Sequence, residues 1–136
     1  MIAFFDASAL IYLIEGNEPF AGNVRRELAA IARKNPELGA AVSRLTWLEC
    51  RVGPMKANDA ATLALYDAFF VCSDLAWVEL TRDVIELAAA IRVKHGLRTP
   101  DALQAASCLQ LGKDHVFLSG DKAFRRVGGL NVKVLT

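Results

Sequence analysis

The sequence predicts an α/β fold in which a small, mainly parallel sheet is covered by helices on both faces. Short apolar segments alternate with longer segments whose apolar residues recur at helical spacing. Helix-stop signals such as Asn35-Pro36 and Gly96 separate several of these segments. Strands that alternate with helices are typical of parallel sheets, because each parallel strand needs a long crossover before the next. Five strands are expected, at residues 2–5, 40–42, 76–80, 115–118 and 131–135.

The helices are placed by their caps and their apolar faces. Ser8 is expected to cap a helix over 9–14, and Asn58-Asp59 a helix over 60–70. Thr46 is expected to open a helix that Gly53-Pro54 interrupts or ends. Thr99 and Pro100 together predict the start of a helix that ends near residue 112. Two further amphipathic helices are expected at residues 19–34 and 81–95.

The bulk properties favour one intracellular domain over residues 1–136. The length matches a single domain with its own core. A net charge of +1 means that nucleic acid could be attracted only by local clusters of basic residues. Three cysteines without a CxxC pair favour reduced thiols in the cytoplasm. No window is long and apolar enough for a membrane span, so we expect a soluble protein that does not bind membranes.

Four acidic residues follow predicted strands or lie in the first turn of the next helix. They are Asp6, Glu49, Asp101 and Asp121. The carboxyl ends of parallel strands line one crevice, where ligands bind in such folds. Carboxylates gathered there stay ionised together only if a cation compensates them. Their oxygen atoms suit Mg²⁺ or Mn²⁺, and phosphoryl chemistry is a common use of such a site.

Each acid also has a purely structural interpretation. Asp6 fits an Asx turn, Asp101 a helix N-terminus, and Asp121 the cap of a short segment over 122–126. Thr46 and Glu49 fit a capping box. Capping does not, however, require all four acids at one edge of one sheet. Nearby hydroxyl groups that can support carboxylates or bound water belong to Ser8, Thr46, Thr99 and Ser119.

Four segments in this order resemble the PIN-domain family, most closely its ribonuclease toxins of the VapC type. The segments are FFDASALI, LTWLEC, GLRTPDALQAA and FLSGDKAF, which together extend over nearly the whole chain. The resemblance implies a three-layer α/β/α fold and a Mg²⁺- or Mn²⁺-dependent endoribonuclease. It also implies that the chain is the toxin of a type II toxin–antitoxin system, with RNA as substrate, a VapB-type antitoxin as partner and a homodimer as assembly.

By position, the resemblance assigns the family's catalytic and metal-binding acids to Asp6, Glu49, Asp101 and Asp121. Ser119 matches a hydroxyl residue that often accompanies the last acid, and Ser8 stands where Thr is common. One departure is Gly120, which stands where similar proteins often have Asn. Whether Asp121 is a ligand therefore stays open, as does the choice between one metal ion and two.

Basic residues near the acidic segments are candidates for contacts with RNA phosphates. They are Arg98, Arg51 and Lys122, and Arg98 is the best single candidate because it lies close to Asp101. Two other functions remain open. A phosphoacceptor domain of the receiver type shares the architecture, but it usually has two adjacent acids where Asp6 stands alone. A PIN-like module that binds without catalysis is the second alternative.

Overall fold

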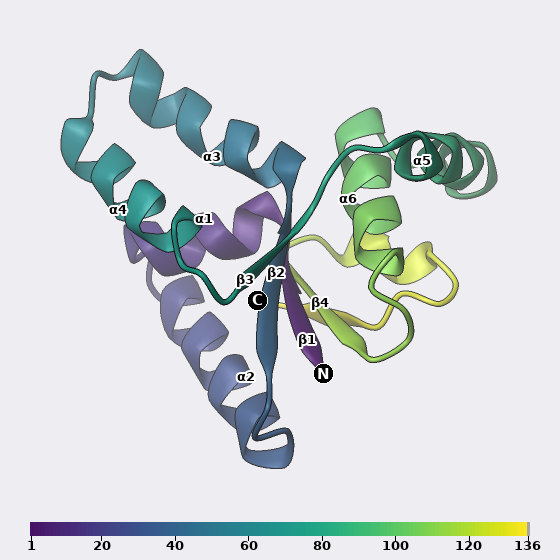
Figure 1. The fold of residues 1–136 in the computed structure, drawn as a ribbon, viewed down its shortest axis with the longest axis horizontal. Coiled ribbons are helices and arrows are strands. Elements are labelled where there is room, and N and C mark those ends of the chain that lie inside the picture. The colour runs from purple at the N-terminus through teal and green to yellow at the C-terminus, as the bar shows by residue number, and fades with distance from the viewer. Residues whose placement is uncertain (136) are drawn as a thin grey trace.

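A computed structural model describes residues 1–135 and contains one five-stranded parallel sheet with the strand order β3-β2-β1-β4-β5 (Figure 1). The expected parallel α/β fold is thereby confirmed. Every adjacent pair of strands is parallel. The strands are β1 (Ile2–Phe5), β2 (Gly39–Ser43), β3 (Leu75–Val78), β4 (His115–Ser119) and β5 (Val132–Val134).

Helices cover both faces of the sheet and give it three layers. In Figure 1, α1 to α4 lie on one side of the sheet, and α5 and α6 lie on the other. A short 3₁₀ helix, η1 (Lys122–Arg126), follows β4. The α-helices are α1 (Ala7–Glu15), α2 (Phe20–Lys34), α3 (Arg44–Lys56), α4 (Ala60–Phe70), α5 (Arg82–His95) and α6 (Thr99–Leu109).

Strand β1 divides its apolar side chains between two cores. Successive side chains of a strand point to opposite faces. Phe4 therefore stacks on Phe117 in the core under α5 and α6, with ring centroids 5.4 Å apart. Ala3 and Phe5 face the other way and belong to the core under α1 to α4. The run IAFF is apolar throughout because both of its faces are covered.

The chain reverses direction across the sheet beside β1, which defines the point where a ligand is expected. From β1, the chain first moves outward through β2 and β3, and later returns to place β4 on the other flank of β1. The carboxyl ends of β1 and β4 therefore border the switch point of this sheet. Asp6 directly follows β1, and its backbone N–H donates to the carbonyl of Leu118 in β4.

Three local expectations were wrong at helix starts. Asp6, not Ser8, caps α1. Ser43 caps α3, so Thr46 and Glu49 form no capping box, and the helix continues through Pro54. Arg98 occupies the cap position of α6, and Thr99 is already helical. In each case the helix begins one to three residues earlier than expected; only Asp6 separates β1 from α1, and no residue separates β2 from α3.

Candidate functional site

Asp6 is a buried carboxylate, with only 6% of the residue exposed, and three hydrogen bonds fix its position. Its Oδ1 accepts from the Ala9 N–H at 2.9 Å and from Ser8 Oγ at 2.7 Å. Its Oδ2 accepts from Ser119 Oγ at 2.5 Å. Burial raises the pKa of Asp6 to about 6, because the three donors, which lower it, do not offset the loss of hydration; a smaller repulsion from Glu49 raises it further.

Ser8 and Ser119 join the start of α1 to the loop after β4. Ser8 Oγ donates to Asp6 and accepts from the Gly120 N–H at 2.9 Å. Ser119 Oγ donates to Asp6 and accepts from the Asp121 N–H at 3.0 Å. Each hydroxyl thus uses both its donor and its acceptor capacity. The two serines hold the Asp6 carboxylate in one orientation at the switch point.

Glu49 reaches this region from α3, where it is half-buried. Its Oε1 accepts from the amide nitrogen of Gln104 at 2.9 Å. Burial raises the pKa of Glu49, and repulsion from Asp101 adds to the increase, while the Gln104 hydrogen bond opposes it. The carboxylates of Asp6 and Glu49 repel each other, and so do those of Glu49 and Asp101. Glu49 therefore interacts electrostatically with each of the other two acids.

Asp101 lies in the first turn of α6, after Pro100, with 22% of its side chain exposed. The Arg98 guanidinium approaches it, with Nε 3.5 Å from Asp101 Oδ2. The side chain of Arg98 is itself 84% exposed, so most of the guanidinium remains in contact with solvent. This ion pair gives little stability, because exposed pairs are screened by water.

Asp121 differs from the other three acids because it is exposed and caps η1. Its Oδ1 accepts from the Ala123 N–H at 2.8 Å. It lines a surface pocket with Gly120, Lys122, Arg125 and Val134. The structure thus gives Asp121 the structural role considered from sequence, and its backbone N–H contacts Ser119, which holds Asp6.

The space beside Gly120 is occupied by a tyrosine, which explains the departure noted in the sequence. A Cβ atom at position 120 would lie 2.6 Å from Tyr12 Oη and 3.0 Å from Tyr12 Cε2. Tyr12 is in turn stacked on Phe20, with ring centroids 4.7 Å apart. A side chain at position 120, such as Asn, therefore requires the tyrosine to move.

Gly120→Ala is expected to destabilise the protein by about 1–3 kcal/mol through overpacking against Tyr12. In the Tyr12→Leu background, which lacks the phenol atoms, the same substitution should cost at least about 0.5 kcal/mol less. Urea unfolding of the wild-type protein, both single variants and the double variant measures this coupling. An equal cost of Gly120→Ala in the two backgrounds would show that Tyr12 does not constrain position 120.

A comparison with family models identifies the chain. The model described as the PIN domain matches residues 3–130. The chain belongs to the PIN-domain family. This assignment confirms the resemblance seen in the sequence and the three-layer α/β/α fold. It also removes the support for a receiver-type domain. No curated protein sequence matches the chain.

Solved structures similar to this PIN domain come from toxin–antitoxin complexes. One is VapBC2 from Rickettsia felis bound to a promoter DNA fragment, with 16% identity, a TM-score of 0.77 and full coverage of both chains. A toxin–antitoxin complex from Klebsiella pneumoniae has 24% identity, a TM-score of 0.70 and 98% coverage of both chains. VapBC-1 from nontypeable Haemophilus influenzae has 18% identity and a TM-score of 0.69, covering 99% of this chain and 98% of that one. At these identities the likeness establishes the shared fold.

A divalent ion bound by the acids of this PIN domain would have few protein ligands. Within residues 1–135, no three His, Cys, Asp or Glu side chains lie close enough to hold an ion between them. Mg²⁺ is usually bound through one or two carboxylates, keeps several waters and takes further oxygens from substrate phosphates. The carboxylates of Asp6, Glu49 and Asp101 have oxygen donors of this kind, and Glu49 interacts electrostatically with each of the other two.

The basic candidates of the PIN domain differ in how far they are already paired. Arg51 packs over the Trp47 ring and forms an ion pair with Asp67 of α4. Lys122 lines the pocket beside Asp121. Arg98 contacts the candidate site directly through Asp101. The sequence interpretation missed two further residues, Gln104 and Tyr12. Gln104 had a detectable signal, as a polar residue one turn after Asp101 in an apolar run.

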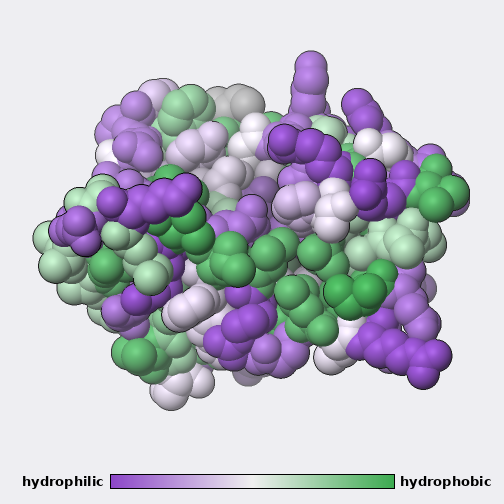
Figure 2. All heavy atoms as spheres, turned by 90° about the horizontal axis from the view of Figure 1, so that it is seen from above, coloured by the Kyte–Doolittle hydropathy of each residue, from purple (hydrophilic) through white to green (hydrophobic). Residues whose placement is uncertain are grey.

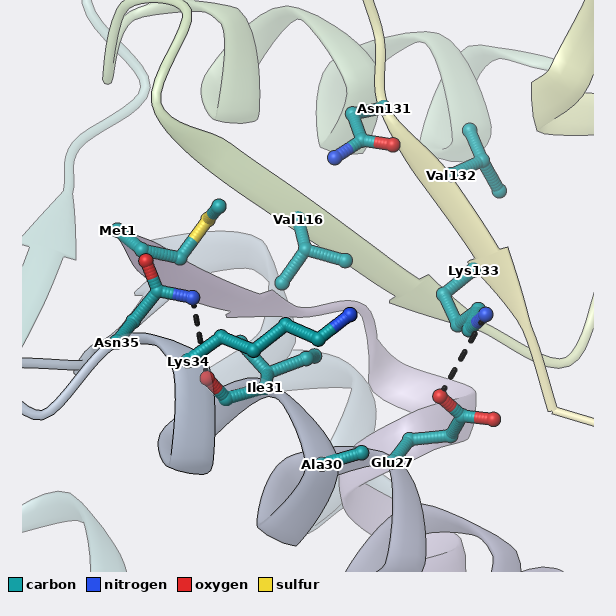
Figure 3. Close-up of a pocket in the computed structure, with 10 residues that line it drawn as sticks. All are labelled: Met1, Glu27, Ala30, Ile31, Lys34, Asn35, Val116, Asn131, Val132 and Lys133. Carbon is teal, nitrogen blue, oxygen red and sulfur yellow. Dashed lines mark hydrogen bonds and ion pairs between the residues drawn. The ribbon is translucent and has the colours of Figure 1, made fainter.

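A separate pocket lies between α2 and the starts of β1, β4 and β5, away from the acids (Figure 3). Lys133 and Glu27 form an ion pair across it. Its lining includes Met1 and Val116, near the amino ends of β1 and β4, whereas Asp6 follows the carboxyl end of β1. This pocket is therefore distinct from the candidate site. In residues 1–135, none of the helices has the length and apolar character needed to cross a membrane.

Proposed function

We propose that this PIN domain is a metal-dependent endoribonuclease and the toxin of a VapC-type toxin–antitoxin pair. The observation that carries the proposal is the placement of Asp6. It is buried at the switch point of the sheet, fixed by Ser8 and Ser119, and electrostatically coupled to Glu49. A capping role alone would not require a second acid that interacts with Asp6. The solved relatives, which are toxin–antitoxin complexes, support the toxin assignment.

Each residue of the site has a distinct part in the proposed hydrolysis. Asp6 and Asp101 would hold Mg²⁺ or Mn²⁺, and Ser8 and Ser119 fix the orientation of Asp6. When bound, the ion activates water and neutralises charge on the scissile phosphate. Glu49 accepts the proton of the attacking water, a role for which its raised pKa suits it. Water oxygen bonds to phosphorus, the phosphorus–oxygen bond to the leaving ribose breaks, and solvent protonates the leaving oxygen.

Incubation of the purified protein with single-stranded RNA tests this function. We expect cleavage with Mg²⁺ or Mn²⁺ and none after chelation by EDTA. The same preparation of an Asp6→Asn variant controls for contaminating nuclease. Metal-independent cleavage by both proteins, or no cleavage of any RNA tested, including total cellular RNA, would contradict the proposal. If metal-dependent cleavage is observed, sequencing of the cleaved RNA ends would identify the target.

Arg98→Ala is expected to weaken RNA binding about uniformly across sequences, because the residue would contact phosphate and not bases. The slope of log Kd against log salt should fall by about 0.7, the value for one phosphate contact on a single strand. Filter binding in Ca²⁺, which should not support cleavage, measures both quantities. Arg33→Ala, in the last turn of α2, is the matched control and should behave as wild type. Equal effects of the two variants would argue against a phosphate contact at Arg98.

A VapB-type antitoxin and a second copy of the chain are the proposed partners. Large apolar side chains of α3 and α4 are exposed, namely Trp47, Leu48, Val52, Met55 and Leu65. Figure 2, which views the molecule from above, shows hydrophobic side chains in a band that crosses the middle of the molecule. Apolar surface of this extent is typical of protein contact sites. We therefore propose that the exposed side of α3 and α4 takes part in partner binding.

A further inference from the structure

A line of polar side chains on α6 faces the start of α3 through the protein interior. Asp101, Gln104 and Ser107 are spaced three residues apart and so lie along one side of the helix. Gln104 contacts Thr46 and Glu49, and Ser107 Oγ lies 3.3 Å from Ser43 Oγ. Asp101 interacts electrostatically with Glu49. These contacts fix the relative position of the two helices that carry Glu49 and Asp101.

Gln104 is the unusual member of this line because its amide is only half satisfied. The residue is 3% exposed, and its Nε2 donates to Thr46 Oγ1 and Glu49 Oε1, both at 2.9 Å. Its Oε1 is buried and has no hydrogen-bond partner. The orientation of the amide follows from chemistry, since an ionised Glu49 only accepts hydrogen bonds and must face the NH₂ group.

An unpaired buried carbonyl oxygen lowers the stability of the folded protein. An apolar side chain of similar length, such as Met, would fill the same space without that cost. Contact with Thr46 does not explain the amide, because the Thr46 hydroxyl has its own helix carbonyls as alternative partners. The contact that only the amide can provide is the one with Glu49.

We propose that Gln104 is a positioning residue that holds Glu49 Oε1 and leaves Oε2 as the oxygen available to the bound ion or its water. This inference rests on the proposed metal-dependent function. Gln104 itself touches neither the ion nor the RNA. Residues that orient metal ligands in this way typically contribute 10–100-fold to metal affinity or activity.

The test compares two variants that break different contacts of the same amide. Gln104→Met removes the donor to Glu49 and keeps the side-chain length, whereas Thr46→Val removes only the other acceptor. Mn²⁺ binding to the RNA-free proteins is measured by the loss of the free-ion paramagnetic resonance signal, and folding by circular dichroism and urea unfolding. Gln104→Met should weaken Mn²⁺ binding about 10–100-fold. Thr46→Val should change the Mn²⁺ affinity less than about threefold, even if this variant loses as much stability as Gln104→Met.

Three results would overturn the inference, and they are distinguishable. If the wild-type protein binds no Mn²⁺, the proposed function fails together with the inference. If the wild type binds Mn²⁺ and Gln104→Met binds it equally well, only the positioning role fails. If both variants lose affinity in proportion to their lost stability, the role of Gln104 is structural. Should Gln104→Met not fold, Gln104→Leu provides the same comparison with a shorter apolar side chain.

Discussion

Asp6→Asn is expected to reduce RNA cleavage at least about 1,000-fold, equivalent to roughly 4 kcal/mol of transition-state stabilisation. The substitution removes the negative charge that would hold the ion and keeps the shape of the side chain. The amide oxygen of Asn can still accept from the Ala9 N–H, so α1 should keep its cap. The measurement is the initial rate of cleavage at saturating Mg²⁺.

The same variant should be more stable than the wild-type protein in EDTA at neutral pH. The pKa of Asp6 is about 6 in the folded protein and near 3.8 without burial. Between these values the folded state binds more protons than the unfolded state, so wild-type stability falls as pH rises from about 4 through 6. At pH 7 and above, the buried ionised carboxylate lowers the free energy of unfolding by about 3 kcal/mol, and the uncharged Asn side chain does not. Urea unfolding across this pH range measures the difference.

Asp114→Asn is the matched control for both effects. Asp114 is an exposed carboxylate that pairs with the N-terminal amine. It lies at the amino end of β1, whereas Asp6 follows the carboxyl end of that strand. Its substitution should leave the cleavage rate unchanged and should not reproduce the pH-dependent gain in stability. Cleavage at the wild-type rate by folded Asp6→Asn protein would contradict the proposed role of Asp6. An unchanged pH profile of stability would show that Asp6 is not the buried acid described here.

Metal affinity should fall about tenfold between pH 7.5 and pH 5, because protons compete with the ion for Asp6. Above a pKa of about 6 the carboxylate is ionised and ready to bind, whereas below it the ion must displace a proton. The raised pKa of Glu49 acts in the same direction. Calorimetric titration with Mn²⁺ at several pH values measures the change and the number of protons released.

This linkage also predicts how the metal affects stability. A ligand that binds only the folded state stabilises it by RT ln(1 + [L]/Kd), so saturating Mg²⁺ should raise the melting temperature more at pH 7.5 than at pH 5. Asp6→Asn should show little stabilisation at either pH. An affinity that is constant over this range would contradict binding through Asp6.

The sequence predicted the fold well because local signals and global packing agreed. The apolar run before Asp6 is buried from Ala3 to Phe5, and the glycine that was expected to end α5, Gly96, adopts the left-handed conformation at its C-cap. Helix starts were predicted less well. At α3, Ser43 and Thr46 are both good caps, and only the point where β2 ends decides between them. The residue at which β2 ends depends on its pairing with β1 and β3, and both strands are distant from β2 in sequence.

The candidate site was predicted to different degrees. Asp6 and Asp101 were identified because a strand end and a helix start were expected to bring them to one edge of the sheet, and their shared ion stays a prediction. The exposure of Asp121 and the pairing of Arg51 with Asp67 could not be inferred, because both depend on side-chain directions in the folded chain. The contact of Gln104 with Glu49 joins residues 55 positions apart and became visible only in three dimensions.

The most direct test of a shared metal site is anomalous X-ray diffraction from crystals soaked in Mn²⁺. We expect a peak at the carboxyl ends of β1 and β4, about 2.0–2.3 Å from oxygens of Asp6 and Asp101 or bridged to them by bound water. Glu49 should lie within reach of the same ion or its water. A nuclease-active protein whose Mn²⁺ peak lies elsewhere, or that shows none at saturating concentration, would contradict the account.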